Sequence, residues 1–325
     1  MQRKVWFNGN LIDEAHAKVS IYDSALMFGD TVFEMTRSFN KTQFMLREHL
    51  KRLYASMHYV HMPEPITIDE MEKACYEIME ANRSMFAEDD EHRLMINVTR
   101  GLLGIYENVV DVPKGPNVII ADFPLRWTVA SMGRLFDVGI NAVIPSQRAI
   151  PASLLEPKVK NRSRLHYLMA NIEVSNYRGS NNWALLIDPD GYIAEGTGDN
   201  FFIIKGKTLL TPEPRNILRG ISRDYIINTL ADQLGYTVVE TNIEPYDVYQ
   251  ADEAFMTGTP FCMLPVTKLN SVSIGTGQVG FCYKELLTAW SETVGVDIEF
   301  QIKSWANNGD LQSTSPTPYQ FKVNT

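Results

Sequence analysis

The chain has 325 residues, of which 45% are hydrophobic and 21% are charged, and it carries a net charge of −9. This composition is ordinary for a globular protein, so it excludes a disordered or fibrous chain. A chain of this length can form two domains, each with its own core. The negative charge argues against a nucleic-acid partner, because binding to the phosphate backbone requires a basic surface. Small molecules therefore remain as the expected partners.

The cysteines and the N-terminal segment indicate the cellular setting. The three cysteines, Cys75, Cys262 and Cys282, are widely spaced, they form no CxxC pair, and the histidines do not cluster. The sequence therefore predicts neither a disulfide framework nor a zinc site, and we expect no metal. The N-terminus turns polar before any apolar run of signal-peptide length, and no stretch reaches the roughly 20 apolar residues of a membrane span. We expect a cytoplasmic protein without a membrane partner.

Turn, capping and periodicity signals predict several elements of the first half. Asn8-Gly9 stands between two short apolar runs, and this dipeptide readily adopts the positive backbone angles of a tight hairpin turn. Thr67 and Glu70 have the spacing of a capping box, and apolar residues follow them at helical period. The expected elements are a hairpin over residues 5–12, a helix over about 68–80, and strands over 93–99 and 118–121.

The second half alternates strands with helices. A helix is expected after Lys160, and its apolar face should pack against the sheet. That face consists of Leu165, Leu168, Met169 and Ile172. The other expected elements are strands over 141–144, 183–187, 192–193, 200–204 and 254–256, and helices over 222–234 and 283–294.

The pattern of the first half breaks at residues 122–127, and we place the domain boundary there. The resulting fold class is α/β, in the sense of a two-domain α+β protein. The expected parts are an N-terminal α/β domain over residues 1–122, an interdomain linker over 123–134, a C-terminal domain over 135–300 and a polar C-terminal tail over 301–325.

Two lysines, Lys158 and Lys160, lie in a segment that could contain a reactive amine. A lysine becomes a catalytic amine only if burial or a cationic neighbour keeps it partly neutral. Lys160 follows Val159 and precedes Arg162 and Arg164, and Lys158 has a similar composition around it. The residue types alone do not decide which of the two lysines is the reactive amine. A lysine in such a segment is more often a solvated surface residue.

Two further segments have features of a binding site. Glu195 precedes two glycines in the run Ala194 to Asn200, and glycines let a backbone approach a flat ring closely. Taken alone, Glu195 would more often be a solvated turn residue. Gly220-Ile221-Ser222 stands at the start of an expected helix, where backbone N–H groups can bind a phosphate. Ser222 is equally suited to be an ordinary N-cap, and the two roles are compatible.

The segments 157–167, 194–200 and 218–224, in this order, resemble the class IV aminotransferases of fold type IV. This family includes branched-chain and D-amino acid aminotransferases, (R)-amine transaminases and aminodeoxychorismate lyase, and the resemblance extends from about Trp6 to Val296. It implies the D-amino acid aminotransferase-like fold, with pyridoxal 5'-phosphate bound between the domains and mainly by the C-terminal one. It also implies a homodimer, in which a loop over about residues 102–110 completes the active site of the neighbouring subunit.

The resemblance assigns roles to individual residues. It selects Lys160 as the lysine that binds the cofactor covalently, because family members have a glutamate about thirteen residues further on, and Glu173 stands there. Glu195 would keep the ring nitrogen of the cofactor protonated, which the cofactor requires to withdraw electrons. The other expected cofactor contacts are Arg52, Ile221, Ser222 and Thr259 at the phosphate and Leu218 against the ring.

The chain departs from the family where the substrate binds. Branched-chain enzymes have Tyr-x-Arg where this chain has Arg93 and Met95, and D-amino acid enzymes have Arg-x-His where it has Ile105-Tyr106-Glu107. Pro260 has no N–H to offer at a turn that holds the substrate carboxylate in branched-chain enzymes. Arg164 stands where branched-chain enzymes usually have a tyrosine, and the resulting Lys-x-x-x-Arg-Leu pattern resembles aminodeoxychorismate lyase. We expect Arg93 or Arg164 to bind the carboxylate.

The expected reaction is transamination between an amino acid, of branched-chain or D-amino acid type, and a 2-oxo acid. The alternatives are a β-elimination of the aminodeoxychorismate lyase type, (R)-amine transamination, and a non-catalytic scaffold on the same fold. Nucleotide-binding folds lack support, because no GxGxxG or GxxxxGK[ST] run follows a strand. Serine hydrolase chemistry lacks support as well, since the chain has no GxSxG motif.

Overall fold

The computed structural model describes residues 2–108, 111 and 113–307. The chain divides into two compact units. The first unit comprises Met1–Leu125 together with Val159–Arg164, and the second comprises Arg126–Lys158 together with Leu165–Thr325. The short segment that contains Lys160 thus belongs to the first unit, although it follows the first part of the second unit, Arg126–Lys158, in the sequence.

A five-stranded antiparallel sheet forms the centre of the first unit, in the strand order β2-β1-β7-β6-β3. Its turn between β1 and β2 has positive φ at Asn8 (47°) and Gly9 (87°), which confirms the predicted hairpin. Strand β7 is longer than predicted, because it stays paired with β6 as far as Pro124. The strands are β1 (Lys4–Phe7), β2 (Asn10–Asp13), β3 (Thr31–Met35), β6 (His92–Thr99) and β7 (Asn117–Pro124), and β4 (Ser38–Phe39) pairs with β5 (Thr42–Gln43) outside this sheet.

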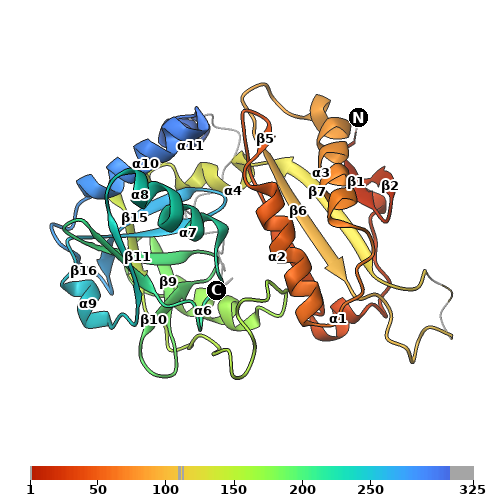
Figure 1. Cartoon of the computed structure of the whole chain (residues 1–325), viewed down its shortest axis with the longest axis horizontal. Helices are drawn as coiled ribbons and strands as arrows, with labels where there is room; N and C mark the ends of the chain where they lie inside the picture. Colours follow the sequence, from red (N-terminus) through yellow and green to blue (C-terminus); the bar gives the residue numbers. More distant parts are fainter. Residues whose placement is uncertain (1, 109–110, 112, 308–325) are drawn as a thin grey trace. The chain divides into compact units, whose positions relative to one another are not determined.

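Helices α2 (Leu46–Tyr59) and α3 (Ile68–Asn82) cover one face of this sheet (Figure 1). Both hydrogen bonds of the predicted capping box at Thr67 and Glu70 are present, and α3 begins directly after Thr67, at Ile68. Even-numbered residues of β6 pack into the core with the helices, so Arg93, Met95 and Asn97 lie on the opposite face. The unit also contains α1 (Ser24–Phe28), η1 (Glu14–His16) and η2 (Arg83–Met85).

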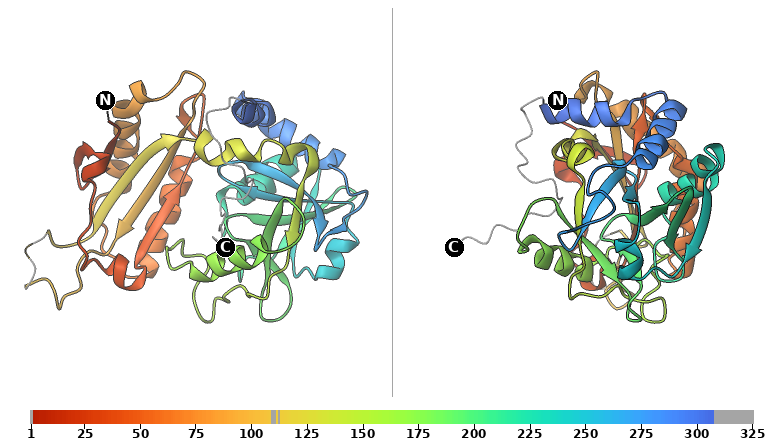
Figure 2. Two further views of the ribbon diagram at one scale, coloured as in Figure 1. Left: turned by 180° about the vertical axis from the view of Figure 1, so that it is seen from behind. Right: turned by 90° about the vertical axis from the view of Figure 1, so that its left-hand side faces the viewer.

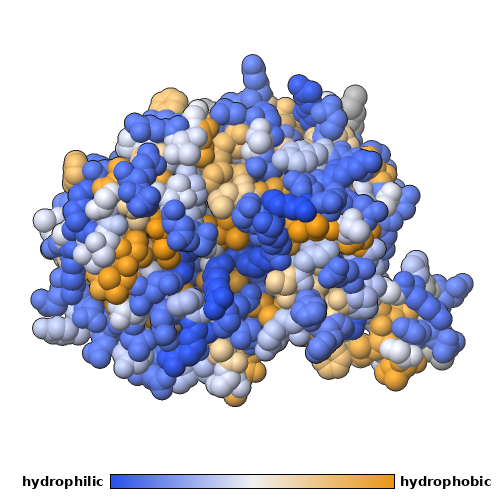
Figure 3. Space-filling view, in the orientation of Figure 1, coloured by the Kyte–Doolittle hydropathy of each residue, from blue (hydrophilic) through white to orange (hydrophobic). Residues whose placement is uncertain are grey.

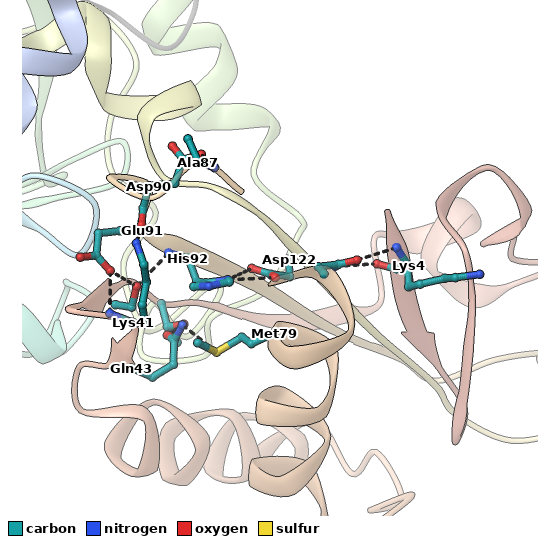
Figure 4. Close-up of polar contacts among 12 residues, drawn as sticks. Lys4, Lys41, Gln43, Met79, Ala87, Asp90, Glu91, His92 and Asp122 are labelled. Atoms are coloured by element: carbon teal, nitrogen blue, oxygen red, sulfur yellow. Dashed lines mark hydrogen bonds and ion pairs between the residues drawn. The ribbon is translucent and has the colours of Figure 1, made fainter. Parts of the chain in front are cut away.

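Buried polar groups connect the start of β6 to its neighbours (Figure 4). The Glu91 carboxylate accepts hydrogen bonds from the Ser38 hydroxyl (2.5 Å) and from the backbone N–H groups of Asn40 (2.8 Å) and Lys41 (3.1 Å). His92 Nδ1 lies 3.0 Å from both carboxylate oxygens of Asp122. Burial raises the pKa of Asp122, and its hydrogen bond with His92 opposes this effect. These contacts stabilise the first unit without involving a predicted site residue.

A nine-stranded sheet forms the centre of the second unit. Strand β10 pairs with β9 and also with β11, so β10, β9, β8, β15, β14 and β11 close into a ring. Strands β12 and β13 extend the sheet from β11, and β16 pairs with β15. The strands are β8 (Ile140–Val143), β9 (Asn182–Ile187), β10 (Ile193–Gly196), β11 (Asn200–Lys205), β12 (Thr208–Pro212), β13 (Thr237–Thr241), β14 (Glu253–Gly258), β15 (Cys262–Leu269) and β16 (Val272–Ser273).

Helices pack around this ring. The helix predicted over 222–234 is present as one continuous run with a π-helical turn, η4, in its middle. Helix α10 packs on β14 and β15, while α11 packs on η3 and α4 (Figure 2). The helical segments are α4 (Arg126–Val129), η3 (Ala130–Met132), α5 (Leu135–Val138), α6 (Leu165–Ser175), α7 (Ile221–Tyr225), η4 (Ile226–Leu230), α8 (Ala231–Gln233), α9 (Pro245–Tyr249), α10 (Phe281–Val294) and α11 (Ile298–Asn307).

Two details of the second unit differ from the sequence-based expectations. The predicted inward face of α6 was wrong, because Leu165 and Met169 are 68% and 48% exposed, while Ala170 and Val174 are buried. Helix α11 continues past residue 301, where we expected the polar tail to begin, and it buries Ile302. The rest of that tail, residues 308–325, lies outside the described residues. Among the described helices, none has both the length and the apolar character needed to span a bilayer.

Candidate active site

Lys160 lies beside the edge strand β3 of the first unit. The Phe33 N–H donates to the carbonyl oxygen of Lys160 (2.9 Å), and Val32 forms a β-bridge with Asn161. The N–H of Lys160 donates to the Ser56 hydroxyl of α2 (3.3 Å). Backbone contacts to a strand and to a helix therefore fix the position of this lysine, and its Nζ lies 4.8 Å from the centroid of the Phe33 ring.

Lys158 has different surroundings, although it is only two residues away. Its Nζ forms an ion pair with Glu156 (2.5 Å) and donates to the carbonyl oxygen of Arg215 (3.1 Å). These two contacts give Lys158 a structural role in the second unit. The structure thus gives different surroundings to the two lysines, which the residue types alone did not distinguish.

Three cationic side chains surround the ring of Phe33, which is 2% exposed. The guanidinium of Arg162 lies 3.6 Å from the ring centroid and that of Arg164 lies 5.6 Å from it, in addition to the amine of Lys160. Arg162 also donates from Nε (3.1 Å) and Nη2 (2.8 Å) to the Asn97 side-chain oxygen. This concentration of positive charge favours an anionic ligand.

The two predicted carboxylate-binding residues lie at different places on the same unit. Arg93 Nη2 is 3.7 Å from the sulfur of Met35. Because Arg93 is four residues from Asn97 along β6, the two Cα atoms are roughly 13 Å apart at ~3.4 Å per residue. Arg164 lies over the same Phe33 ring as Lys160, and Arg93 contacts Met35 further along the pair of strands β3 and β6.

Arg52 lies on α2, one helical turn before Ser56. Its Nε and Nη2 donate to the two carboxylate oxygens of Glu34, at 2.7 and 2.8 Å. The Ser56 hydroxyl donates to the carbonyl oxygen of Arg52 (2.9 Å) and accepts the N–H of Lys160. Arg52 and Lys160, predicted from segments more than a hundred residues apart, thus share one neighbour in the first unit.

Glu195 lies at the end of β10 in the second unit and is 5% exposed. Its carboxylate accepts three hydrogen bonds, from the Tyr167 hydroxyl (2.7 Å), the Asn200 amide (3.0 Å) and the backbone N–H of Leu218 (2.9 Å). These donors compensate for the burial of the carboxylate and fix its orientation. A solvated turn glutamate, the alternative left open by the sequence, does not fit this environment.

The other predicted residues of the second unit lie at the start of α7, just before it, and in the turn after β14. Asn200 pairs with Glu195 on one side and with Thr257 on the other, and Thr259 follows in the next turn. Gly220 precedes α7 without a side-chain cap, so the first-turn N–H groups near Ile221 and Ser222 can bind an anion. A Cβ atom at Gly220 would lie 2.1 Å from the Asn200 side-chain oxygen, and this close approach requires glycine.

Comparisons with known proteins identify the family of this chain. The family model for amino-transferase class IV matches residues 31–269. A putative branched-chain-amino-acid aminotransferase of Methanocaldococcus jannaschii is 37% identical over 284 residues, which cover 87% of this chain and 93% of that protein. The branched-chain-amino-acid aminotransferase of Escherichia coli K12 is 32% identical over 300 residues, covering 88% and 91%. The chain belongs to the class IV aminotransferases.

Solved structures of this family have the same fold. The branched-chain aminotransferase of Escherichia coli aligns with a TM-score of 0.79 at 30% identity, covering 90% of this chain and 94% of the other. The T.th. branched-chain aminotransferase, in complex with N-(5'-phosphopyridoxyl)-L-glutamate, aligns with a TM-score of 0.79 at 29% identity and the same coverage. The chain is therefore a fold type IV transaminase that depends on pyridoxal 5'-phosphate, as the sequence motifs predicted.

Each unit by itself has groups whose chemistry suits this cofactor. In the second unit, Glu195 is a buried carboxylate, which a pyridinium nitrogen requires, and the start of α7 offers N–H groups, which a phosphate requires. In the first unit, Arg52 is a cation with the fixed charge that a phosphate also requires. Sequence reasoning assigned no role to the contacts that orient these groups, which are made by Glu34, Tyr167 and Asn200. Of these three residues, Tyr167 could best have been predicted from the sequence, because it lies in the same motif as Lys160.

Proposed function

We propose that this enzyme transfers the amino group of a branched-chain amino acid to a 2-oxo acid. The observation that carries the proposal is the 37% identity, over 87% of the chain, to a protein named as a putative branched-chain-amino-acid aminotransferase. Further relatives with this name are 30–32% identical over similar lengths. The absence of the Tyr-x-Arg signature at Arg93 and Met95 means that the substrate carboxylate is held differently from the rest of that group.

The predicted site residues divide the tasks of this reaction among them. When bound, the cofactor withdraws electrons from the substrate and so stabilises negative charge at its Cα. Lys160 would bind the cofactor in the resting enzyme and would move a proton between the Cα atom of the substrate and the C4′ atom of the cofactor. Glu195 keeps a proton on the ring nitrogen. As the family resemblance implies, the phosphate would be held by Arg52, Ile221, Ser222 and Thr259, and Leu218 would contact the ring.

A panel of amino donors tests the substrate. The panel contains L-leucine, L-valine, D-alanine, D-glutamate and (R)-1-phenylethylamine, each with 2-oxoglutarate as acceptor, and kcat/KM is measured by cofactor absorbance. We expect the two L-branched-chain amino acids to be the best donors. A higher kcat/KM with the D-amino acids or the amine would contradict the proposal. Pyruvate released from aminodeoxychorismate without an acceptor would indicate the β-elimination instead.

We expect Arg164 to bind the substrate carboxylate, because its guanidinium approaches the Phe33 ring that Lys160 also contacts. A charge-assisted hydrogen bond contributes roughly 1.5–3 kcal/mol, so Arg164→Ala should lower kcat/KM for amino acids about ten- to hundredfold. The effect on (R)-1-phenylethylamine, which lacks a carboxylate, should be much smaller. Arg93→Ala is the comparison variant, and a larger selective loss there would assign the carboxylate to Arg93.

A homodimer completes the proposal. Figure 3 shows hydrophobic surface around α1 and the loop after β6, where Leu26, Phe28 and Ile105 are 64%, 67% and 72% exposed. Large exposed apolar side chains in one area indicate a protein interface. The predicted dimer loop, residues 102–110, begins in this area, and its residues 109 and 110 lie outside the described part of the chain.

Sedimentation velocity at assay concentration tests the dimer. We expect one dimeric species, and Phe28→Glu should shift it towards monomer and lower activity together, because a buried unpaired charge destabilises an interface. A fully active monomer would rule out the shared active site.

A cytoplasmic location is also part of this proposal, and it is supported by the cysteines, none of which forms a disulfide within the described residues.

A further inference from the structure

A buried cluster of Glu34, His49 and Arg52 connects β3 to α2 in the first unit. The side chains of Glu34 and His49 are 0% and 1% exposed, and that of Arg52 is 12% exposed. One edge of the Arg52 guanidinium, formed by Nε and Nη2, faces the Glu34 carboxylate at 2.7 and 2.8 Å. His49 Nδ1 lies 2.7 Å from the same carboxylate. Only Arg52 of the three has appreciable access to solvent.

The charges in this cluster follow from its surroundings. Burial would raise the pKa of Glu34, but the charges of Arg52 and His49 and the hydrogen bonds from both residues hold this pKa well below its usual range. Glu34 is therefore an ionised carboxylate that can only accept hydrogen bonds, so His49 donates from Nδ1. Burial lowers the pKa of His49, and the charges of Arg52 and Lys160 lower it further, against the effect of Glu34. Arg52 is the permanently charged partner of the Glu34 carboxylate, and His49 is a second hydrogen-bond donor to it.

The helix explains how two side chains reach one carboxylate. His49 and Arg52 are three residues apart on α2, so they lie on the same side of the helix and both face β3. A guanidinium that is held along one edge has a fixed plane, whereas a flexible arginine would lose rotamer freedom on binding a ligand. The cluster thus prepares Arg52 for an anion before that anion binds.

We propose that Glu34 is a positioning residue for the cofactor: it fixes the guanidinium of Arg52 in the orientation that binds the phosphate, and His49 holds Glu34 in place. The inference rests on the proposed placement of the phosphate at Arg52. Glu34 itself is fully buried, so it acts through Arg52. It follows that the loss of Glu34 weakens binding of the phosphorylated cofactor much more than binding of its unphosphorylated form.

The test compares pyridoxal phosphate with pyridoxal as ligands of the full-length apoenzyme, with Kd measured by absorbance titration. Glu34→Gln removes the charge at nearly constant shape, so we expect its Kd for pyridoxal phosphate to rise about ten- to hundredfold. Its Kd for pyridoxal should change less than about threefold. Arg52→Lys should cause a similar selective loss, because an ammonium cannot bind bidentately. The variant with both Glu34→Gln and Arg52→Lys should bind pyridoxal phosphate only slightly more weakly than Arg52→Lys alone.

Glu91→Gln is the matched control. Glu91 is another buried glutamate of the same unit, and its partners are Ser38 and the backbone of Asn40 and Lys41 (Figure 4). This variant should lower the melting temperature and leave the ratio of the two Kd values unchanged. If Glu34→Gln does not fold, Glu34→Asp replaces it, since the shorter carboxylate keeps the charge but cannot reach both Arg52 and His49.

The possible outcomes separate the inference from its premise. A selective loss in both the Glu34 and Arg52 variants supports the inference. A selective loss in Arg52→Lys alone overturns the role of Glu34 and leaves the phosphate at Arg52. An equal loss for both ligands in Glu34→Gln shows a merely structural role and also overturns it. If Arg52→Lys leaves the Kd ratio unchanged, the phosphate lies elsewhere, and the placement fails together with the inference.

Discussion

Lys160→Ala should abolish turnover and covalent binding of the cofactor, while Lys158→Ala should retain both. The reaction needs one particular amine to hold the cofactor and to move the proton from the substrate Cα, and we expect the loss of such a group to lower kcat roughly 10⁴-fold or more. Lys158 is occupied by its ion pair with Glu156 and its bond to Arg215, so its loss should change kcat less than about threefold.

Two measurements check the assignment to Lys160. The first is borohydride reduction of the holoenzyme followed by peptide mapping, and the label should be found on Lys160. The second is thermal unfolding of the Lys160→Ala apoenzyme, which should resemble that of the parent, because the backbone of residue 160 makes the contacts to Phe33 and Ser56. A label on Lys158, or on any other lysine, would show that the wrong residue has been assigned.

Glu195→Gln should lower kcat roughly 10²- to 10³-fold, the range observed when a group that stabilises developing charge is removed. A glutamine cannot keep a proton on the ring nitrogen by charge, so the ring withdraws electrons less strongly. The side-chain shape is nearly conserved, and we therefore expect the cofactor still to bind. The amide would also place an N–H donor opposite the donors from Tyr167, Asn200 and Leu218, which adds a modest loss of stability.

Glu285→Gln is the control for this variant. Glu285 accepts hydrogen bonds from the Tyr236 hydroxyl (2.6 Å) and from Lys207 (2.9 Å), and it belongs to the same unit as Glu195. The Glu285→Gln variant should retain full activity. Single-turnover kinetics with L-leucine distinguish the chemical step from binding, and a Glu195→Gln enzyme with an unchanged single-turnover rate would refute the role of Glu195.

The sequence alone determined the family and the cofactor. The segments around Lys160, Glu195 and Ser222 follow one another in the order of the class IV aminotransferases, and the family model and the solved structures confirm this prediction. Local structure was also predictable where a local rule applies. The Asn8-Gly9 turn and the capping box of α3 depend on residues at most three positions apart, so the chain encodes them without tertiary contacts.

Other features could not be obtained from local patterns. Helix α2 was not predicted, because Met45 precedes it in a left-handed conformation and without a side-chain cap, which leaves no start signal. The inward face of α6 was predicted wrongly. Periodicity identifies residues that share a face, but the neighbouring strands decide which face packs, and here they accept the smaller Ala170 and Val174.

The tertiary structure alone decided how the predicted site residues are oriented. Lys160 is positioned by Phe33 and Ser56, and Glu195 by Tyr167, 28 residues earlier, and by Leu218, 23 residues later. The fixed edge of Arg52 likewise depends on Glu34, which is on a different element. No periodicity connects residues at such separations. They meet only because strand pairing and helix packing bring distant parts of the chain together, and the hydrogen bonds that orient a catalytic group form after that.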